Sequence, residues 1–263
     1  MTQDSRPAAL SLVPKEEMAK ADNRDGLYRL NMGSGRSMRQ PGWTNCDLHD
    51  GPNVDVACDI TKPWPFPDNS AAEVYSSHVL EHLHDPMGFF REAYRVLVPN
   101  GSMTLRLPYG GHHAAWWDIT HVRPWFSESF AVLQPGYNQA SGNPQHDEGG
   151  IAFGINVVQL RVSYKMARML RRWWWRYLFG KFYAFWDHEI EEIWGHFYAL
   201  KTDDAISAYR LTHEPNIVGT SFVAYKHHLN GTPPPAGGMV VMVDLGSGST
   251  INGFIARVTG EEK

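Results

Sequence analysis

A glycine-rich turn directly after a short apolar segment constrains the fold of this chain more than any other feature. Residues 30–35 read Leu-Asn-Met-Gly-Ser-Gly, and two further short segments end in the aspartates Asp47 and Asp59. Glycine adopts positive φ and lets a ligand approach the backbone without meeting a β-carbon. If the three segments are neighbouring strands, one edge of the sheet carries the turn and both carboxylates. The pattern therefore predicts an α/β fold with a ligand site at this edge.

The two aspartates have the chemistry to hold an adenosine. A carboxylate at the position of Asp47 can accept both hydroxyls of a ribose. Asp59 can accept a hydrogen bond from an exocyclic amine such as N6 of adenine, and Ile60 can contact the ring. A Gly-x-Gly pair alone is more often an ordinary turn, so the prediction depends on the later segments of the chain.

Three later motifs occur in a fixed order. A Pro- and Phe-rich loop spans 64–70, the segment 72–77 leads into His-Val-Leu-Glu-His at 78–82, and Leu-Val-Pro-Asn-Gly at 97–101 precedes a further apolar segment. This succession resembles the class I S-adenosylmethionine-dependent methyltransferases over residues 27–130. The resemblance implies S-adenosylmethionine as the cofactor. It also implies a Rossmann-like, seven-stranded, mostly parallel sheet with helices on both faces and an antiparallel final strand pair.

The chain departs from the family pattern in three places. Asn31 stands where the family usually has an aspartate, and asparagine replaces a glycine in Leu-Val-Pro-Asn-Gly, where it tolerates the same left-handed backbone. Only eleven residues separate Gly35 from Asp47, so we expect the first crossover helix to be very short or replaced by a loop. A nicotinamide-binding Rossmann fold fits less well, because Met38 occupies its third glycine position.

The resemblance implies a cofactor site built from the glycine turn, the two acidic strand ends and the start of the segment after the fourth strand. The expected cofactor-binding residues are Asn31, Gly33, Ser34, Gly35, Asp47, Leu48, Asp59, Ile60, Ser77 and His78.

The acceptor side is expected in the loop after the segment 102–107. His112, His113 and His121 are candidate general bases, because histidine accepts a proton near neutral pH, and Asp118 is a candidate orienting carboxylate. A metal site of His112, Asp118 and His121 is disfavoured by its loose spacing, so no metal is expected. His78 and His82 resemble a zinc-protease pair only superficially, because the glutamate does not directly follow the first histidine.

The overall composition is that of a modest globular enzyme. The chain has 263 residues, 43% of them hydrophobic, with a net charge of −4 that gives no overall nucleic-acid signature. Cys46 and Cys58 fall in expected strands and are interpreted as core residues. No apolar run reaches the about 18 residues of a membrane span, and a cytoplasmic location is the default expectation.

Three domains or regions are expected. Residues 1–26 form an N-terminal arm, 27–228 the methyltransferase domain with a loop and helical lid inserted at 134–200, and 229–263 a linker and a short C-terminal β-hairpin. Strands are expected near 27–32, 43–47, 54–58, 72–77 and 102–107, a crossover helix after Asp85, and an antiparallel strand pair at 205–211 and 217–225.

A second glycine motif near the C-terminus reads Asp-Leu-Gly-Ser-Gly at 244–248. Only thirteen residues follow Thr250, too few for further acidic strand ends, so the motif is interpreted as a hairpin turning between Gly246 and Gly253.

An aromatic and basic segment lies inside the expected lid. Nine of the fourteen positions 173–186 are aromatic, and 149–186 contains seven Lys or Arg and no acidic residue. The segment suits a helical lid packed over the acceptor pocket or against a second copy, a stacking surface for single-stranded nucleic acid, or a membrane interface. The acidic run at 187–192 favours the packed lid. A homodimer could form through this segment or through the C-terminal hairpin.

The sequence predicts a methyltransferase that uses S-adenosylmethionine and acts on a small-molecule or sugar-type acceptor by in-line transfer. The alternatives are a nucleic-acid-directed methyltransferase and a catalytically silent protein that uses the fold for binding or assembly. Amino methylation of DNA bases is disfavoured, because Ser76-Ser77-His78 stands where such enzymes have an Asp/Asn-Pro-Pro-Tyr run.

Overall fold

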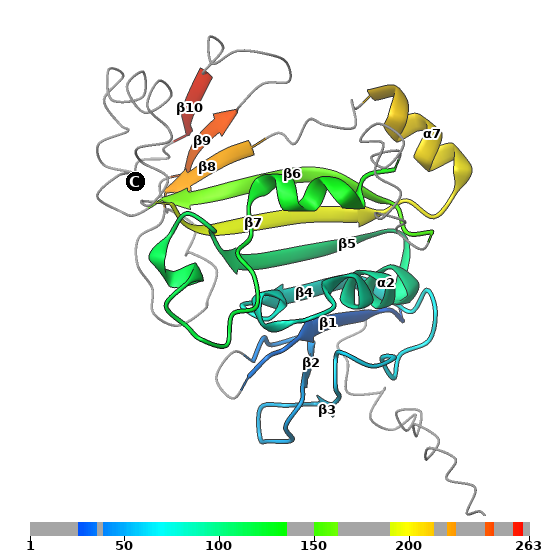
Figure 1. Cartoon of the computed structure of the whole chain (residues 1–263). Helices are drawn as coiled ribbons and strands as arrows, with labels where there is room; N and C mark the ends of the chain where they lie inside the picture. Colours follow the sequence, from blue (N-terminus) through cyan, green and yellow to red (C-terminus); the bar gives the residue numbers. More distant parts are fainter. Residues whose placement is uncertain are drawn as a thin grey trace, which may run out of the picture.

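The computed structural model describes residues 26–35, 39–135, 150–162, 190–212, 220–224, 240–244 and 255–259 (Figure 1). The first elements are β1 (Tyr28–Met32), β2 (Thr44–Asp47), β3 (Val56–Ala57), β4 (Ala71–Ser77), the 3₁₀ turn η1 (Leu80–His82), α2 (Pro86–Val96), β5 (Leu97–Pro108), η2 (His113–Ala115) and η3 (Ser127–Leu133). They are followed by β6 (Phe153–Val162), β7 (Ile190–Ala199), α7 (Asp203–Thr212), β8 (Thr220–Ala224), β9 (Val240–Asp244) and β10 (Ile255–Thr259). The five strands expected between 27 and 107 and the helix after Asp85 are confirmed.

The described strands form an eight-stranded sheet in the order β3-β2-β1-β4-β5-β7-β6-β8. Strands β1 to β5 pair in parallel, whereas β7 is antiparallel to both β5 and β6, and β8 is parallel to β6. The Rossmann-like, mostly parallel sheet is therefore confirmed. The strands from β3 to β6 are the seven expected, and β8 extends the edge.

The predicted position of the antiparallel pair is wrong. Residues 205–211 lie inside α7, and β8 pairs in parallel with β6. Thr202 caps the helix, since its Oγ1 accepts a hydrogen bond from the N–H of Ala205 at 3.2 Å, and two aspartates follow in the first turn. These helix-start signals outweigh the strand-like appearance of the sequence.

The loop and helical lid expected over 134–200 also needs correction, because β6 and β7 lie inside this range. Buried residues such as Ile193 and Phe197 in β7 face the core, as a strand in the middle of a sheet requires. The aromatic and basic segment, the loop at 136–149 and all but the last residue of the N-terminal arm lie outside the described residues.

The C-terminal β-hairpin is confirmed. β9 and β10 pair antiparallel, with Asp244 opposite Ile255 and Val240 opposite Thr259. The two strands form a separate two-stranded sheet, and β9 contacts β8 at the edge of the large sheet (Figure 1).

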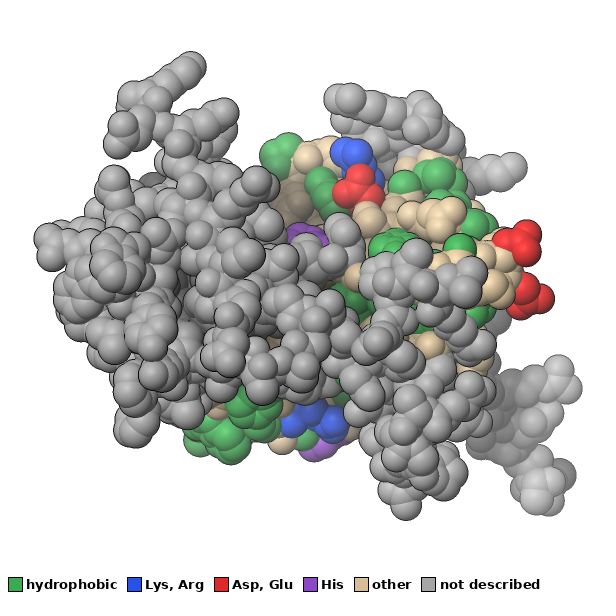
Figure 2. Space-filling view, turned by 90° about the horizontal axis from the view of Figure 1, so that it is seen from above, with side chains coloured by type: hydrophobic (Ala, Val, Ile, Leu, Met, Phe, Trp, Pro, Cys, Tyr) green, Lys and Arg blue, Asp and Glu red, His purple; other side chains and the backbone are tan. Residues whose placement is uncertain are grey.

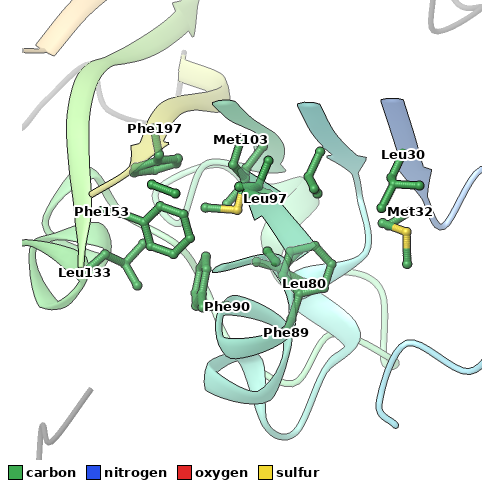
Figure 3. Close-up of a cluster of buried hydrophobic side chains, with 14 of the residues drawn as sticks. Leu30, Met32, Leu80, Phe89, Phe90, Leu97, Met103, Leu133, Phe153 and Phe197 are labelled. Carbon is green, nitrogen blue, oxygen red and sulfur yellow. The ribbon is translucent and has the colours of Figure 1, made fainter. Parts of the chain in front are cut away.

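The main core lies between α2, η3 and one face of the sheet (Figure 3). Met103, Leu105 and Leu107 of β5 are completely buried at alternate positions, and Phe89 and Phe90 of α2 are buried with them. Further along the sheet, aromatic rings continue the contact: Trp125 stacks on Phe130 at 5.6 Å, and Phe130 packs on Phe197 at 5.1 Å. Cys46 is buried and Cys58 partly buried, as expected of core residues.

A charged clamp fixes the Pro- and Phe-rich loop to α2. Arg95 donates hydrogen bonds to the carbonyl oxygens of Trp64 at 3.1 Å and Phe66 at 2.8 Å, and it pairs with Asp68 at 2.7 Å. Glu92 accepts from the N–H of Trp64 at 2.6 Å and from Arg95 at 2.7 Å. The clamp holds the segment that follows Asp59 in place.

Candidate functional site

The order of the strands reverses between β1 and β4. β2 and β3 are added to the sheet on one side of β1, whereas β4 and then β5 are added on its other side (Figure 1). In open α/β sheets, ligands bind at the carboxyl ends of the strands where the order reverses in this way. The glycine turn follows β1, and His78 follows β4, so both lie at this switch point.

The glycine turn has the backbone that its sequence predicts. Gly33 and Gly35 have φ values of +77° and +59°. The N–H groups of Gly33 and Ser34 both donate to the carbonyl oxygen of Cys46 at 2.9 Å, which ties the turn to β2. A β-carbon on Gly33 would lie 2.3 Å from Cγ2 of Val79, whereas one on Gly35 would meet nothing of the described residues within 4 Å. Gly35 is therefore the position where a ligand can reach the backbone.

Asp47 stabilises this turn. Its Oδ2 accepts the N–H of Gly35 at 2.7 Å, and its Oδ1 accepts the N–H of His49 at 3.3 Å. Each carboxylate oxygen has two lone pairs, so Asp47 retains acceptor capacity for the hydroxyls of a ligand. Leu48, the next residue, is 59% exposed and offers apolar surface beside the carboxylate.

Asp59 is held by its own loop. Its Oδ1 accepts the hydroxyl of Thr61 at 2.6 Å and the N–H of Thr61 at 3.0 Å, and its Oδ2 lies 3.1 Å from Nζ of Lys62. The hydrogen bonds from Thr61 lower the pKa of the Asp59 carboxyl. Ile60 is partly buried against the core, and its carbonyl oxygen accepts the indole N–H of Trp64 at 3.2 Å.

The asparagine that replaces the family's usual aspartate has a structural explanation. Asn31 is buried, and its Nδ2 donates to Oδ1 of Asn45 at 2.9 Å. Asn45 also accepts the N–H of Gln40 at 2.8 Å and donates to Oδ2 of Asp55 at 2.9 Å. An aspartate at 31 could not donate to Asn45, so the amide suits this buried network.

Ser77 is the last residue of β4, and His78 follows it, directly before the Val79 that lies against Gly33. Oγ of Ser77 is buried and has no hydrogen-bond partner among the described residues. His78 has a φ of +54°, which is unusual for a non-glycine residue and is stabilised here by contacts of its imidazole. Neighbouring Ser76 instead donates to the carbonyl oxygen of Met32 at 2.9 Å and links β4 to β1.

A charged cluster at the same edge was missed by sequence reasoning. It consists of His78, Arg106, Arg161, Glu192 and Trp194, and we call it the Glu192 cluster. Glu192 accepts hydrogen bonds at Oε2 from Nε of Arg106 at 2.9 Å and from the indole of Trp194 at 3.0 Å. The guanidinium of Arg161 lies 3.4 Å from the centroid of the Trp194 ring. Apart from His78, these residues come from β5, β6 and β7, so only the folded sheet brings them together.

Opposing charges set the protonation states in this cluster. His78 lies between two carboxylates, with Nε2 3.4 Å from Glu192 and Nδ1 3.3 Å from Glu81. Burial opposes the charge on the imidazole, but the contacts with Glu192 and Glu81 raise the pKa of His78 to about 9. Burial likewise opposes the charge on Glu192, but the contacts with His78 and Arg106 hold the pKa of its carboxyl well below the usual range.

The loop after β5 carries the candidate general bases in two groups. His112 and His113 lie together, with ring centroids 4.1 Å apart, and Nδ1 of His112 accepts the N–H of Ala114 at 3.2 Å. His121 instead packs against His82, with centroids 4.8 Å apart, and its Nδ1 donates to the carbonyl oxygen of Ala115 at 3.1 Å.

Asp118 does not bond directly to a candidate base. Its Oδ2 lies 4.0 Å from Nε2 of His121, and its Oδ1 accepts the N–H and the hydroxyl of Thr120 at 2.9 Å and 2.7 Å. The bonds from Thr120 lower the pKa of the Asp118 carboxyl. Beside it the loop exposes large apolar side chains, with Trp116, Trp117 and Ile119 being 63%, 72% and 98% exposed.

Comparison with known proteins supports the resemblance seen in the sequence. The family model described as a methyltransferase domain matches residues 42–105, which run from the start of β2 into β5. The resemblance to the class I S-adenosylmethionine-dependent methyltransferases is thereby confirmed. No curated protein matches the chain.

Several solved structures are similar to this chain at low identity. A methyltransferase of Haloferax volcanii in complex with the Trm112 methyltransferase activator is 16% identical, covering 70% of this chain and 88% of that chain, with a TM-score of 0.41. An S-adenosylmethionine-dependent methyltransferase from Mesorhizobium loti is 17% identical, covering 66% and 91%, with a TM-score of 0.38. A methyltransferase structure from Bacillus halodurans is 15% identical, covering 72% and 98%, with a TM-score of 0.38.

Among the described residues, no helix is both long enough and apolar enough to cross a membrane.

Proposed function

We propose that this chain, with the fold and the family match of the class I methyltransferases, binds S-adenosylmethionine beside its glycine turn and transfers the methyl group to a small-molecule or sugar-type acceptor. The observation that carries the proposal is the bond from the N–H of Gly35 to Asp47 at the switch point of the sheet. It places a carboxylate and an open, positive-φ glycine side by side, as recognition of a ribose next to a backbone turn requires.

The residues at this edge fit the cofactor. No described residue fills the space at Gly35. The buried hydroxyl of Ser77 lacks a partner within the same part of the chain, so it can bond to a ligand. Asp47 would hold the ribose hydroxyls, and Asp59 with Ile60 would hold the adenine. When bound, S-adenosylmethionine supplies an activated methyl group and leaves as a neutral thioether.

The chain's own contribution to methyl transfer is to position the acceptor and to remove its proton. His112 and His121 differ in this respect. Nδ1 of neutral His112 accepts an N–H, so the proton of the imidazole lies on Nε2. His112 can therefore donate a hydrogen bond to the methyl-accepting substrate, but it cannot take a proton from it through Nε2. Because Nδ1 of His121 donates to a carbonyl oxygen, Nε2 of neutral His121 keeps its lone pair and can take a proton.

The exposed tryptophans of the loop after β5 favour a small acceptor. The exposed indoles of Trp116 and Trp117 offer apolar faces against which a sugar or another ring can pack. On the face shown in Figure 2, acidic and basic side chains of the described part are interspersed with hydrophobic ones.

Calorimetric titration with S-adenosylmethionine and S-adenosylhomocysteine tests the cofactor site. Asp47→Asn should weaken binding by about tenfold, equal to about 1.4 kcal/mol, because the amide replaces one acceptor oxygen with a donor. Asp50→Asn is the matched control, since Asp50 is exposed on the same loop and, within the described part of the chain, its side chain accepts the N–H of Gly51 at 2.8 Å and nothing else. Lack of binding by the unaltered chain at high micromolar ligand, or equal affinities for all three proteins, contradicts the proposal.

A second assay separates the three functional alternatives. Radiolabelled S-adenosylmethionine is incubated with the chain and with a panel of hydroxylated metabolites, sugars or single-stranded oligonucleotides, and transferred label is counted. Label on a small molecule supports the proposed acceptor class. Label on the oligonucleotide supports the nucleic-acid alternative, and cofactor binding without any transfer across the panel supports a silent binding protein.

A further inference from the structure

The 3₁₀ turn η1 and the loop after β5 bring together three side chains that the proposed methyl transfer does not use as a group. One ligand atom from each of Glu81, His82 and His121 lies within 4.8 Å of the other two. Glu81 and His82 are adjacent in η1, whereas His121 comes from the loop. The hydrogen bond from the N–H of Val122 to the carbonyl oxygen of Glu81, at 2.7 Å, fixes the loop onto η1.

Glu81 is the unusual member of this group. Its side chain is completely buried, and neither of its carboxylate oxygens has a hydrogen-bond partner among the described residues. Its closest charged neighbour is His78, whose Nδ1 lies 3.3 Å from Oε1. Burying a carboxylate without hydrogen bonds is strongly unfavourable unless a positive charge compensates it. The ion pair with His78 compensates the charge at Oε1, whereas Oε2 is buried without a partner among the described residues and is available to a cation.

His82 is oriented by a chain of hydrogen bonds. The hydroxyl of Thr120 donates its proton to Oδ1 of Asp118 at 2.7 Å, so its oxygen must accept from Nδ1 of His82 at 2.9 Å. The carbonyl oxygen of Thr120 also accepts from this Nδ1, at 3.3 Å. The proton of neutral His82 is thereby placed on Nδ1, and the lone pair lies on Nε2.

His121 has the same tautomer as His82, but a different group fixes it. Its Nδ1 lies 3.1 Å from the carbonyl oxygen of Ala115, which can only accept, so the proton is on Nδ1. A histidine that binds a metal through one ring nitrogen almost always donates the other N–H to a carbonyl, a carboxylate or water. Both histidines of the group are oriented in this manner.

We propose that Glu81, His82 and His121 bind a divalent transition-metal ion. Two imidazoles and one carboxylate are a ligand set that suits zinc, iron or manganese. His82 is exposed and His121 partly exposed, so further coordination positions face solvent. Three protein ligands with open positions are typical of catalytic rather than structural metal sites.

Binding requires a small contraction of the group. Ligand atoms around a tetrahedral zinc ion lie about 3.3 Å apart, given metal–ligand bonds of about 2.0 Å. With an ion bound, the lone pair of His121 is used for coordination, so His121 then acts as a ligand and not as a free base.

The test is a titration of the metal-free full chain with Zn(II), followed by calorimetry, and with Co(II), followed by visible absorption. We expect one equivalent of either ion to bind. Glu81→Gln and His121→Gln should each weaken binding by at least about 100-fold, because each removes one of three ligands. His84→Gln is the matched control, since His84 is an exposed histidine two residues from His82 and outside the group, and it should bind as the unaltered chain does.

Thr120→Val gives a second, independent test that leaves all three ligands in place. It removes the hydroxyl that bonds to Nδ1 of His82, and the loss of such a supporting bond weakens metal binding by about 10- to 100-fold. Far-UV circular dichroism confirms that each variant is folded, and Thr120→Val and His121→Gln carry the test if Glu81→Gln does not fold. No binding by the unaltered chain, or folded Thr120→Val and His121→Gln variants that bind as tightly as His84→Gln, would overturn the proposal.

Discussion

At the scale of single residues, Gly33 and Gly35 look alike in the sequence but differ in the structure. Both have positive φ, yet Gly33 faces Val79 across the switch point, while a β-carbon at Gly35 would contact none of the residues that the structure describes. Gly33 is therefore required by packing as well as by backbone conformation. Gly35 is required only by backbone conformation and by any ligand that approaches it.

Alanine substitutions should separate these two requirements. Gly33→Ala should lower the free energy of unfolding by about 2–4 kcal/mol, because it adds overpacking against Val79 to the strain of positive φ. Gly35→Ala should cost about 1–2 kcal/mol, from positive φ alone. Urea unfolding of both variants provides the measurement. Equal losses would show that the contact with Val79 does not matter.

His196 makes a pH-dependent contribution to stability. It lies in β7, and its Nδ1 is 3.1 Å from the hydroxyl of Thr104 on β5. Burial, together with the positive charge of Arg161, lowers the pKa of His196. The unfolded chain then binds a proton more readily than the folded one, so stability falls as the pH drops below the unfolded value of about 6.5.

His196→Gln should reduce this acid sensitivity. The free energies of unfolding of the two proteins are compared at pH 7.5 and 5.5. We expect the unaltered chain to lose more stability than the variant, by at most about 1.4 kcal/mol per pH unit below the unfolded pKa. A larger loss in the variant would mean that the charged imidazole is favoured in the fold.

Site residues that lie close together in the sequence were predictable, whereas site residues that lie far apart in the sequence were not. Gly33, Gly35 and Asp47 are separated by a few residues within one turn and one strand, and the turn they form has the expected backbone. Arg106 and Glu192 are 86 positions apart, and only the antiparallel pairing of β5 with β7 joins them. Glu81 reads as an ordinary helix residue, since nothing in the sequence reveals that both its oxygens are buried.

At the scale of elements, the parallel half of the sheet was predictable from the sequence, and the antiparallel half was not. Strands β1 to β5 are short apolar segments that end in recognisable turns, so their positions were predictable. β6 and β7 were placed within a lid, because their partners are far away and their polar residues, such as Arg161 and Glu192, belong to the cluster at the sheet edge. A polar residue inside a strand hides the alternation that identifies a strand.

The clamp between α2 and the Pro- and Phe-rich loop makes an element-scale prediction. Arg95→Ala should lower the free energy of unfolding by about 2–4 kcal/mol, because two carbonyl oxygens and two carboxylates lose a charged donor. Arg91→Ala on the same helix is the control. Arg91 pairs with the exposed Asp85 at 3.1 Å, and exposed pairs contribute about 0–1 kcal/mol. Similar losses for both variants, measured by urea unfolding, would argue against the clamp.

At the scale of the whole molecule, the sheet separates the candidate cofactor site from the C-terminal hairpin. The site lies at β1, β2 and β4, whereas β9 contacts β8, the last strand at the other end of the order. β5, β7 and β6 stand between them. The hairpin and the glycine turn therefore lie toward opposite ends of the strand order.

Removal of residues 229–263 should leave cofactor affinity nearly unchanged. We expect the affinity for S-adenosylhomocysteine to stay within about twofold of that of the full chain, because distant sites without shared partners act independently. Calorimetry gives the affinity, and circular dichroism shows whether the shortened chain is folded. A folded truncated protein with tenfold weaker binding would mean that the hairpin reaches the site.

The contact between Gly33 and Val79 limits how this sequence can change over evolutionary time. A β-carbon at 33 would have to occupy space that the Val79 side chain already fills. A side chain at 33 therefore becomes tolerable only in a lineage that has first reduced position 79 to a smaller residue, and even then the positive φ disfavours it. The order of the two substitutions matters. Positions 33 and 79 therefore evolve as a coupled pair, although 46 positions of sequence separate them.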